Sequence, residues 1–230
     1  MTTASPPSDA SGDAEGRRAA ARAHAKNARH AAYRDLVVEA AGEAFARDGV
    51  AATRMESLAE AAGISLGTLY SVYRGKAEIV DALHASRLRE IHAASIEAEG
   101  TAPDPLEALL AGSRAYLAYF MARPDYLRMY LDEGANWGVR RSMDRDSRRA
   151  AVWGDGVARL TAIFERGIDE GVFEPGNPDR LARTMLAMQQ VLLADWYEDG
   201  ARARAQDVMN EMEVLLRRAF CTAGGRAPGA

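Results

Sequence analysis

The sequence predicts an all-α protein with a small N-terminal helical domain and a larger helical domain after it. Three observations support this prediction. Alanine is abundant and aromatic residues make up only 7% of the chain, a composition that favours helices over strands. Apolar residues recur every three or four positions along most of the chain. No segment longer than a few residues shows the strict alternation that a half-buried strand requires.

The first 30 residues are expected to form a disordered, partly basic arm. Residues 1–16 are rich in Pro, Ser, Gly and Asp and lack periodicity, so they offer little apolar surface to bury. Residues 17–30, RRAAARAHAKNARH, are basic and rich in alanine. This second stretch is compatible with either a frayed helix or a flexible arm.

Residues 31–91 form the predicted first domain, which begins with a helix from Tyr33. This helix ends at Gly49, because glycine is a common C-terminal stop. Thr53, followed three residues later by Glu56, predicts a capping box that starts a second helix. This second helix ends at Gly63.

A third helix is predicted over residues 66–73, with Ser65 as its N-terminal cap. A longer helix then follows from Lys76 to Glu99. The segment GTAPDP breaks the pattern after it.

Residues 92–222 form the predicted second domain. Beyond the GTAPDP break, helical periodicity indicates five further helices, separated by Gly- and Pro-containing segments. They cover roughly residues 105–122, 124–134, 142–170, 178–199 and 202–221. The tail, residues 223–230, is expected to be disordered.

The charge is distributed unevenly along the chain. The net charge is −4, yet residues 17–89 contain twelve basic against eight acidic residues, and the rest contains seventeen against twenty-five. A basic N-terminal third on an acidic body is typical of a protein whose one end meets a polyanion. The single cysteine, Cys221, and the lack of an apolar run near the ~20 residues of a membrane span favour a soluble, cytoplasmic protein.

The second and third predicted helices are joined by AAGIS, a very short break. Two helices joined by so few residues cross at a steep angle, and close crossing requires small side chains such as Ala59 and Ala62. Gly63 adopts a left-handed turn without steric cost, and Leu69 and Val72 supply apolar anchors inside the corner. This is a helix-turn-helix pattern, in which the second helix is free to enter the major groove of DNA.

The stretch FARDGVAATRMESLAEAAGISLGTLYSVYRGKAEIVDAL, residues 45–83, resembles the DNA-binding domain of the TetR family of bacterial transcription regulators. At the level of motifs the resemblance covers residues 33–91, and the later helices agree with the family in number and order. It implies a homodimer with a three-helix DNA-binding head and a helical domain for ligand binding and dimerisation.

The resemblance also implies which residues contact DNA, residue by residue. At the start of the second helix it implies a phosphate contact by Thr53 and Arg54, and at the start of the fourth by Lys76. Two positions depart from the family pattern: Leu66 and Val72 stand where polar side chains are common, so base readout is expected to use Thr68, Ser71 and apolar contact. The full predicted set is Thr53, Arg54, Ser65, Leu66, Gly67, Thr68, Tyr70, Ser71 and Lys76.

The second domain offers candidate pocket and interface residues. Aromatic, Met and Gln side chains at helical spacing predict a pocket for a largely apolar small molecule: Tyr116, Phe120, Met129, Trp137, Trp153, Met185, Met188 and Gln189. The last two helices carry apolar surfaces wide enough for two partners, which predicts a four-helix dimer interface. Its expected residues are Leu186, Leu193, Met209, Met212, Leu216 and Phe220.

These features predict a ligand-responsive regulator of transcription, a repressor that a small-molecule inducer releases from operator DNA. No catalytic constellation, metal-ligand spacing or cofactor motif is expected, since the four histidines are not spaced to share an ion. One alternative is a helical small-molecule-binding dimer whose head no longer regulates genes. A second alternative, an all-helical enzyme, lacks a supporting set of residues. The basic N-terminal arm either touches DNA, as basic arms can, or is a solvated tail.

Overall fold

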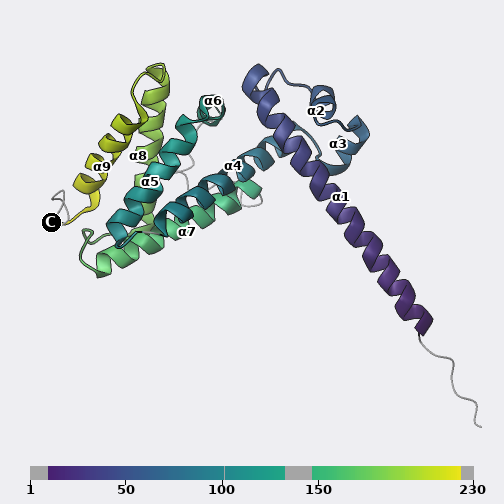
Figure 1. The fold of residues 1–230 in the computed structure, drawn as a ribbon, viewed down its shortest axis with the longest axis horizontal. Coiled ribbons are helices and arrows are strands. Elements are labelled where there is room, and N and C mark those ends of the chain that lie inside the picture. The colour runs from purple at the N-terminus through teal and green to yellow at the C-terminus, as the bar shows by residue number, and fades with distance from the viewer. Residues whose placement is uncertain (1–9, 101, 133–146, 224–230) are drawn as a thin grey trace, which may run out of the picture.

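The computed structural model describes residues 10–100, 102–132 and 147–223, and its elements there are helices (Figure 1). This confirms the predicted all-α fold class. The helices are α1 (Ala10–Asp48), α2 (Met55–Ala61), α3 (Leu66–Val72), α4 (Lys76–Glu99), α5 (Pro105–Met121), α6 (Pro124–Asp132), α7 (Arg148–Asp169), α8 (Pro178–Glu198) and α9 (Ala205–Phe220).

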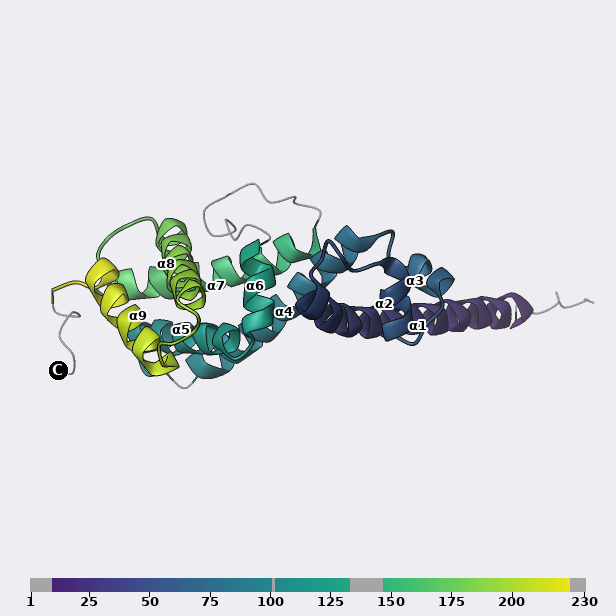
Figure 2. The same cartoon turned by 90° about the horizontal axis from the view of Figure 1, so that it is seen from above.

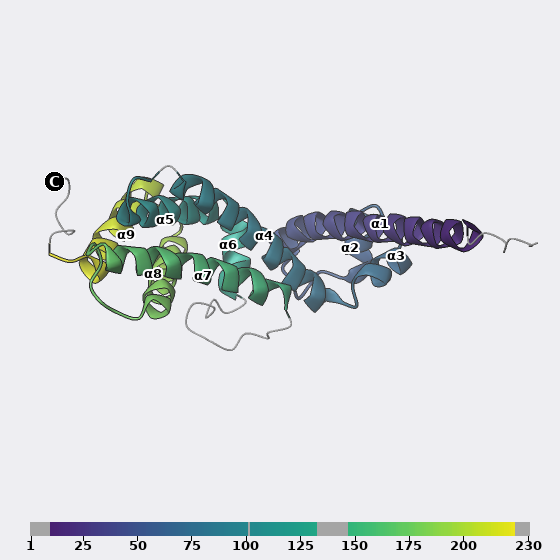
Figure 3. The same cartoon turned by 90° about the horizontal axis from the view of Figure 1, so that it is seen from below.

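The helices form two groups that share α4. The head consists of the C-terminal half of α1 with α2 and α3, and the body consists of α5 to α9, of which α5 and α7 pack on the rest of α4 (Figure 1). Figures 2 and 3 show the two groups along one axis, with α4 running from the head into the body. The first residue of α4 therefore lies in the head and its last residue lies in the body.

Local sequence sets where several helices begin. Ser65, Asp104, Ser147 and Asn177 each accept a hydrogen bond from the backbone N–H three residues on, at 2.9 to 3.0 Å, which satisfies one of the unpaired donors of a helix N-terminus. Proline follows Asp104 and Asn177 at the first helical position, where its fixed φ fits and its missing N–H is not needed.

Two glycines allow helices of the body to pack closely against α4. A Cβ atom at Gly112 of α5 would collide with the carboxylate of Glu99. A Cβ atom at Gly156 of α7 would collide with the ring of His92. Both neighbours belong to α4, so these glycines let polar side chains of α4 lie directly against the backbones of α5 and α7.

The last helix is tied back to the body by the segment that follows α7. The N–H of Glu174 donates to the carbonyl of Phe220 at 2.8 Å, and the N–H of Thr222 donates to the carbonyl of Val172 at 3.0 Å. Cys221 lies buried in the same contact. The end of α9 is thereby fixed against the body rather than left to fray.

The structure corrects the prediction for the N-terminal arm. Residues 10–30 are part of α1, which continues without interruption to Asp48. This replaces the disordered arm expected up to residue 30 and agrees with the helical alternative for residues 17–30. Alanine has the highest helix propensity, and residues 19–32 include eight alanines. A helix already nucleated by the packed half of α1 extends more easily than an isolated one forms. Residues 1–9 and 224–230 lie outside the described part of the chain.

Across the described residues, none of the helices is both long enough and apolar enough to span a bilayer. The same residues contain no cluster of three or more His, Cys, Asp or Glu side chains arranged to hold a metal ion.

Candidate DNA interface and ligand pocket

The turn between α2 and α3 has the geometry that the sequence predicts. Gly63 has a φ of 66°, in the left-handed region where only glycine is unstrained. Its N–H donates to the carbonyl of Glu60 at 3.0 Å, and the N–H of Ile64 donates to that of Ala59 at 3.0 Å. These two bonds form a Schellman motif, which satisfies the last carbonyls of α2 and redirects the chain into α3.

The exposed side of α3 presents a small, polar surface. Ser65 caps the helix through the N–H of Thr68 at 3.0 Å, and the hydroxyls of these two residues lie 2.8 Å apart. The hydroxyl of Ser71 donates to the carbonyl of Thr68 at 2.7 Å. The side chain of Tyr70 is 51% exposed. Because Leu69 is fully buried below them, these side chains are held outward by the core of the head.

The two apolar departures from the family pattern belong mainly to the core. Val72 is 4% exposed, and Leu66 is half-buried against the same cluster of buried residues. A polar side chain at either position would therefore lie partly or wholly inside the head of this protein, and not in a groove of DNA. Arg74 follows α3 and is exposed, so a further cation lies beside the exposed side of α3, and the sequence motifs do not mark it.

The predicted capping box at Thr53 is wrong. Helix α2 begins one residue later, so Arg54 is the N-cap, and within the described residues its side chain makes no capping hydrogen bond. Thr53 is 4% exposed, and its hydroxyl donates to the carbonyl of Gly49 at 2.8 Å. This inward hydrogen bond closes the turn after α1. It takes the place of the hydrogen bond that the Thr53 hydroxyl would accept as a helix cap. Arg54 is exposed.

Lys76 connects α4 to the loop before α2. Its ammonium donates to the carbonyls of Ala51 and Thr53, at 3.0 and 2.9 Å. Since an ammonium has three donors, two are used within the head and one is left for another acceptor. The side chain is half-buried.

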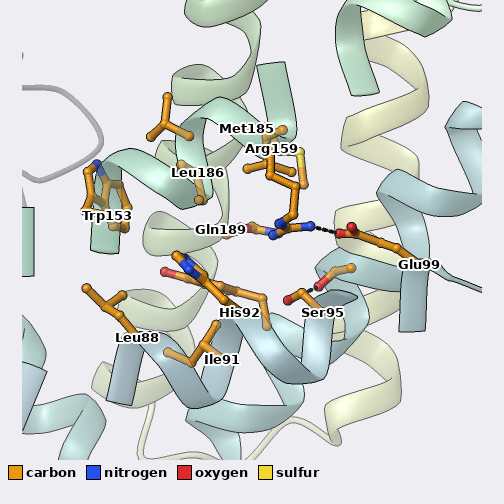
Figure 4. Close-up of a pocket in the computed structure, with 15 residues that line it drawn as sticks. Leu88, Ile91, His92, Ser95, Glu99, Trp153, Arg159, Met185, Leu186 and Gln189 are labelled. Atoms are coloured by element: carbon orange, nitrogen blue, oxygen red, sulfur yellow. Dashed lines mark hydrogen bonds and ion pairs between the residues drawn. The ribbon is translucent and has the colours of Figure 1, made fainter. Parts of the chain in front are cut away.

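A narrow pocket lies in the body between α4, α5, α7 and α8 (Figure 4). Its free volume is about 20 Å³, roughly the room for one water molecule. It is bounded by Leu88, Ile91, His92, Ser95, Glu99, Gly112, Tyr116, Trp153, Gly156, Val157, Arg159, Leu160, Met185, Leu186 and Gln189.

The pocket has an apolar wall and a polar end. Glu99 forms an ion pair with Arg159 across the gap between α4 and α7, with side chains that are 10% and 22% exposed (Figure 4). Burial, with the nearby Arg159 cation, lowers the pKa of His92 to about 4, so this ring is neutral at pH 7. Gln189 is 1% exposed, and among the described residues its side-chain oxygen has no hydrogen-bond partner.

The structure brings four of the predicted pocket residues to this pocket, namely Tyr116, Trp153, Met185 and Gln189. Phe120, Met129 and Met188 do not line this pocket. Phe120 is fully buried, with its ring 4.9 Å from that of Tyr130, and Met129 borders two surface hollows near α1. Met188 packs on the core from the half-exposed side of α8. Trp137 lies outside the described residues.

Sequence reasoning missed the polar end of the pocket. Glu99 and Arg159 lie sixty residues apart and read as ordinary surface charges. A usable signal was present in Gly112 and Gly156, because an isolated glycine inside a helical pattern often marks a close approach. In this fold those approaches are to Glu99 and His92.

The predicted interface residues are mostly part of the protomer's own core. Leu193 and Leu216 are fully buried, Met212 and Phe220 are 1% and 3% exposed, and Leu186 borders the pocket. Only Met209 of the set is half-exposed. The apolar residues that α8 and α9 present to solvent are instead Val191 and Val214, at 58% and 46% exposed. The apolar stripes of α8 and α9 face the core of the protomer, so a partner protomer would contact the opposite, outer faces of these two helices.

An exposed recognition helix on a three-helix head, joined by a shared helix to a body with a pocket, defines a helix-turn-helix DNA-binding regulator. Residues 37–83 match the family model described as bacterial regulatory proteins of the tetR family. Residues 37–83 therefore form a DNA-binding domain similar to that of the TetR family, as the sequence motifs predict.

Relatives and solved structures agree with this assignment. The HTH-type transcriptional repressor KstR2 of Mycobacterium tuberculosis is 27% identical over 190 residues, which cover 80% of this chain and 90% of that protein. The regulator TtgR of Pseudomonas putida is 44% identical over 59 residues, 26% of this chain and 28% of TtgR. The structure of FadR from Bacillus subtilis in complex with stearoyl-CoA superposes with a TM-score of 0.66 at 18% identity, covering 79% of this chain and 96% of that one.

Proposed function

We propose that the protein is a homodimeric repressor of transcription that leaves its operator when a small molecule enters the pocket between α4, α5, α7 and α8. The observation that carries this proposal is α4 itself. Its first residue holds the loop before α2, through Lys76, and its last residue, Glu99, forms part of the pocket. A change at the pocket therefore reaches the DNA-binding head through one continuous helix.

The DNA-reading surface is made by the exposed side of α3 and its neighbours. Thr68, Tyr70 and Ser71 lie on α3 with Gly67, and the exposed Arg54 and Arg74 flank them as cations for phosphates. Hydroxyl groups both donate and accept hydrogen bonds. This surface is therefore expected to distinguish one base pair from another less strongly than arginine or asparagine side chains would. The resemblance to the family supports a major-groove position for α3.

The free half of α1 extends the cationic surface of the head. Between residues 17 and 34 the chain has six Lys or Arg and no acidic residue. Arg18, Arg22, Lys26 and Arg29 recur every four or three residues, so they share one face of the helix. Figures 2 and 3 show this half projecting past α3, on the side of the head remote from the body. We infer that this stripe binds the phosphate backbone.

The dimer is proposed to form through the outer faces of α8 and α9. Val191 and Val214 are exposed there, and half-exposed Met188, Met209 and Leu215 lie on the same two helices. Two helices from each protomer would give a four-helix interface around a two-fold axis. That symmetry places two copies of α3 in successive major grooves, about 34–36 Å apart.

The ligand response follows from the closed state of the pocket. A site of about 20 Å³ is far smaller than the roughly 300–1,000 Å³ of typical ligand pockets. A ligand must therefore separate the surrounding helices, and only a conformation with the pocket open binds it. Its preference for that conformation sets how far operator affinity falls. Relatives such as FadR, solved with stearoyl-CoA, support a ligand with a large apolar part.

The test is binding of the purified chain to labelled fragments of the DNA upstream of its own gene, measured by fluorescence anisotropy at several salt concentrations. The proposal expects salt-sensitive binding of a dimer to at least one fragment. If a folded dimer binds no fragment, the alternative of a ligand-binding dimer with a non-regulatory head is correct.

A further inference from the structure

The polar end of the pocket consists of two charged groups held together inside the body. Among the described residues that line the pocket, Glu99 is the acidic one and Arg159 the strongly basic one. The pKa of His92, lowered to about 4 by burial and by Arg159, keeps that ring neutral. The pair lies against the backbone of Gly112, where a side chain would collide with the carboxylate of Glu99. The helices are thus built to hold this pair in place.

The two members of the pair are held unequally. Glu99 is the last residue of α4, next to the partial negative charge of a helix C-terminus, where a carboxylate is disfavoured. Gly100 follows it, so its backbone can adjust. Arg159 lies in the middle of α7, where the helix fixes its backbone on both sides. Glu99 is therefore the easier of the two to displace.

Hydrogen-bonding groups at this end of the pocket are not used up by the pair. Within the described part of the chain, Nε of Arg159 and the side-chain oxygen of Gln189 are buried and have no hydrogen-bond partner. Both side chains line the pocket, as Figure 4 shows. A guanidinium has five donors in a fork that matches a carboxylate. The amide of Gln189 can present either its oxygen or its NH₂ group by rotating about its last bond.

We propose that the pocket binds an amphipathic carboxylic acid whose carboxylate pairs with Arg159 in place of Glu99. Its apolar chain lies against Leu88, Ile91, Trp153, Leu160 and Met185, and its carboxylate also accepts a hydrogen bond from the amide of Gln189. This inference rests on the proposed function for the existence of a ligand, and it adds the ligand's chemical class. An anion fits because the fixed partner is the cation and the displaceable partner is the anion.

Displacement of Glu99 has a direct consequence for α4. The ion pair joins the C-terminal end of α4 to α7, and its loss leaves that end free to move while the pocket widens. The ligand carboxylate thus supplies to Arg159 what Glu99 supplied before, so the arginine is not left as an unpaired buried charge.

The experiment measures binding of decanoate, 1-decanol, decylamine and decanoyl-CoA to the full chain by isothermal titration calorimetry, below their micelle concentrations. Decanoate is expected to bind, and the alcohol and the amine at least about tenfold more weakly, because they cannot replace a charged hydrogen bond to Arg159. Arg159→Gln is expected to weaken decanoate binding by about tenfold or more for the same reason. Glu99→Gln is expected to strengthen it, since the competing carboxylate is removed. Arg166→Gln, an exposed arginine on the same helix, is the matched control and leaves binding unchanged.

Several outcomes overturn the proposal. On the folded wild-type chain, the proposal is overturned if decanoate does not bind, if 1-decanol binds as tightly as decanoate, or if decylamine binds more tightly than decanoate. It is also overturned if Glu99→Gln loses decanoate binding. Tight binding of decanoyl-CoA that survives Arg159→Gln also overturns it, since the thioester has no carboxylate at that end. The comparison of the four probes on the wild-type chain holds even if Arg159→Gln fails to fold. Operator binding is measured separately on ligand-free protein, so decanoate binding without any DNA binding would reject the proposed function and keep this inference.

Discussion

The ammonium of Lys76, at the start of α4, donates a 2.9 Å hydrogen bond to the carbonyl of Thr53, in the loop that leads into α2. A second bond reaches the carbonyl of Ala51 in the same loop. Lys76 is thus one of the links through which α4 holds the DNA-binding head, beside the packing of α4 on α1. This contact gives the residue a structural role in addition to the phosphate contact that the resemblance implies.

Lys76→Ala separates these two roles. It is expected to weaken binding to all DNA sequences alike, because both a phosphate contact and head position are independent of sequence. A lost phosphate contact also lowers the slope of log affinity against log salt by about one. Anisotropy titrations over a salt series measure both quantities, and Arg89→Ala, exposed on α4, is the control. A weaker affinity with an unchanged slope would leave Lys76 a purely structural role, and a changed base preference would contradict both roles.

The cationic stripe of α1 predicts a large share of the salt dependence. Replacement of Arg18, Arg22, Lys26 and Arg29 by Gln keeps the helix propensity and removes four charges. The salt slope is expected to fall by about 0.9 for each removed cation that touches a phosphate. Matched replacement of the exposed Arg89, Arg166, Arg202 and Arg204, which lie outside α8 and α9, should leave it unchanged. An equal effect of the two sets would show that only overall charge matters and that α1 does not touch DNA.

Gly67 predicts opposite effects on stability and on DNA binding. It lies in α3, where a Cβ atom would meet only Ser65 Oγ at 3.9 Å, so the fold does not require a glycine there. Gly67→Ala is expected to stabilise the head by up to about 1 kcal/mol. The added methyl group weakens DNA binding if α3 packs closely against the duplex.

The control is Gly154→Ala in α7, where within the described residues nothing lies within 4 Å of an added Cβ atom. Thermal unfolding and anisotropy measure the two effects. We expect Gly154→Ala to stabilise the protein and leave DNA affinity unchanged. If Gly67→Ala behaves in the same way, α3 does not approach DNA at this position.

Asp81 joins α4 to the beginning of α7. Its carboxylate accepts the backbone N–H groups of Arg148 and Arg149 at 2.9 and 3.3 Å, which caps α7 and holds it to the head-proximal part of α4. Asp81→Ala is expected to destabilise the protein by about 1 kcal/mol, as lost helix caps do. It also favours the open pocket.

Linkage then requires reciprocal effects of Asp81→Ala on the two binding sites. Operator affinity of the ligand-free protein falls, and affinity for a pocket ligand rises. Anisotropy and calorimetry test the two sides, with the exposed Asp169→Ala as control. Weaker ligand binding together with weaker DNA binding would indicate general damage and reject the coupling.

The buried His84 predicts a loss of stability in mild acid. It is fully buried, its Nδ1 lies 3.1 Å from the hydroxyl of Tyr126, and burial, with the nearby Arg149 cation, lowers the pKa of His84 to about 3. Below the ordinary pKa of about 6.5 the unfolded chain takes up this proton and the folded protein does not. Stability therefore falls as pH drops from about 6.5 toward 3, by up to about 1.4 kcal/mol per pH unit from this residue.

His84→Gln removes that contribution, so its stability should decline less steeply than that of the wild type between pH 6 and 4.5. Chemical denaturation at several pH values measures the difference. His24→Gln, exposed on α1, should follow the wild-type curve. Parallel curves for His84→Gln and the wild type would mean that His84 is protonated in the folded protein as easily as in the unfolded chain.

The sequence by itself determined the helices, the turn and the resemblance of the head to the TetR family. Helical period, the glycine at position 63 and the cap at Ser65 act within a few residues of one another, so local chemistry decides them. The left-handed φ of Gly63 and the hydrogen bond from Thr68 to Ser65 confirm this. The same local reasoning failed at Thr53, because its hydroxyl had two possible local partners. It could accept from a backbone N–H of α2 or donate to the carbonyl of Gly49, and in the structure it donates to Gly49.

Only the tertiary structure decided which faces of those helices meet. An apolar stripe on α8 or α9 looks the same in sequence whether it packs inside the protomer or against a partner, and here Leu193 and Leu216 are fully buried within the protomer. The pairing of Glu99 with Arg159 likewise depends on how α4 and α7 cross. Long-range packing brings these two charges together. A charge pattern along one helix carries no information about a helix sixty residues away. The polar end of the pocket could therefore be recognised only in the folded chain.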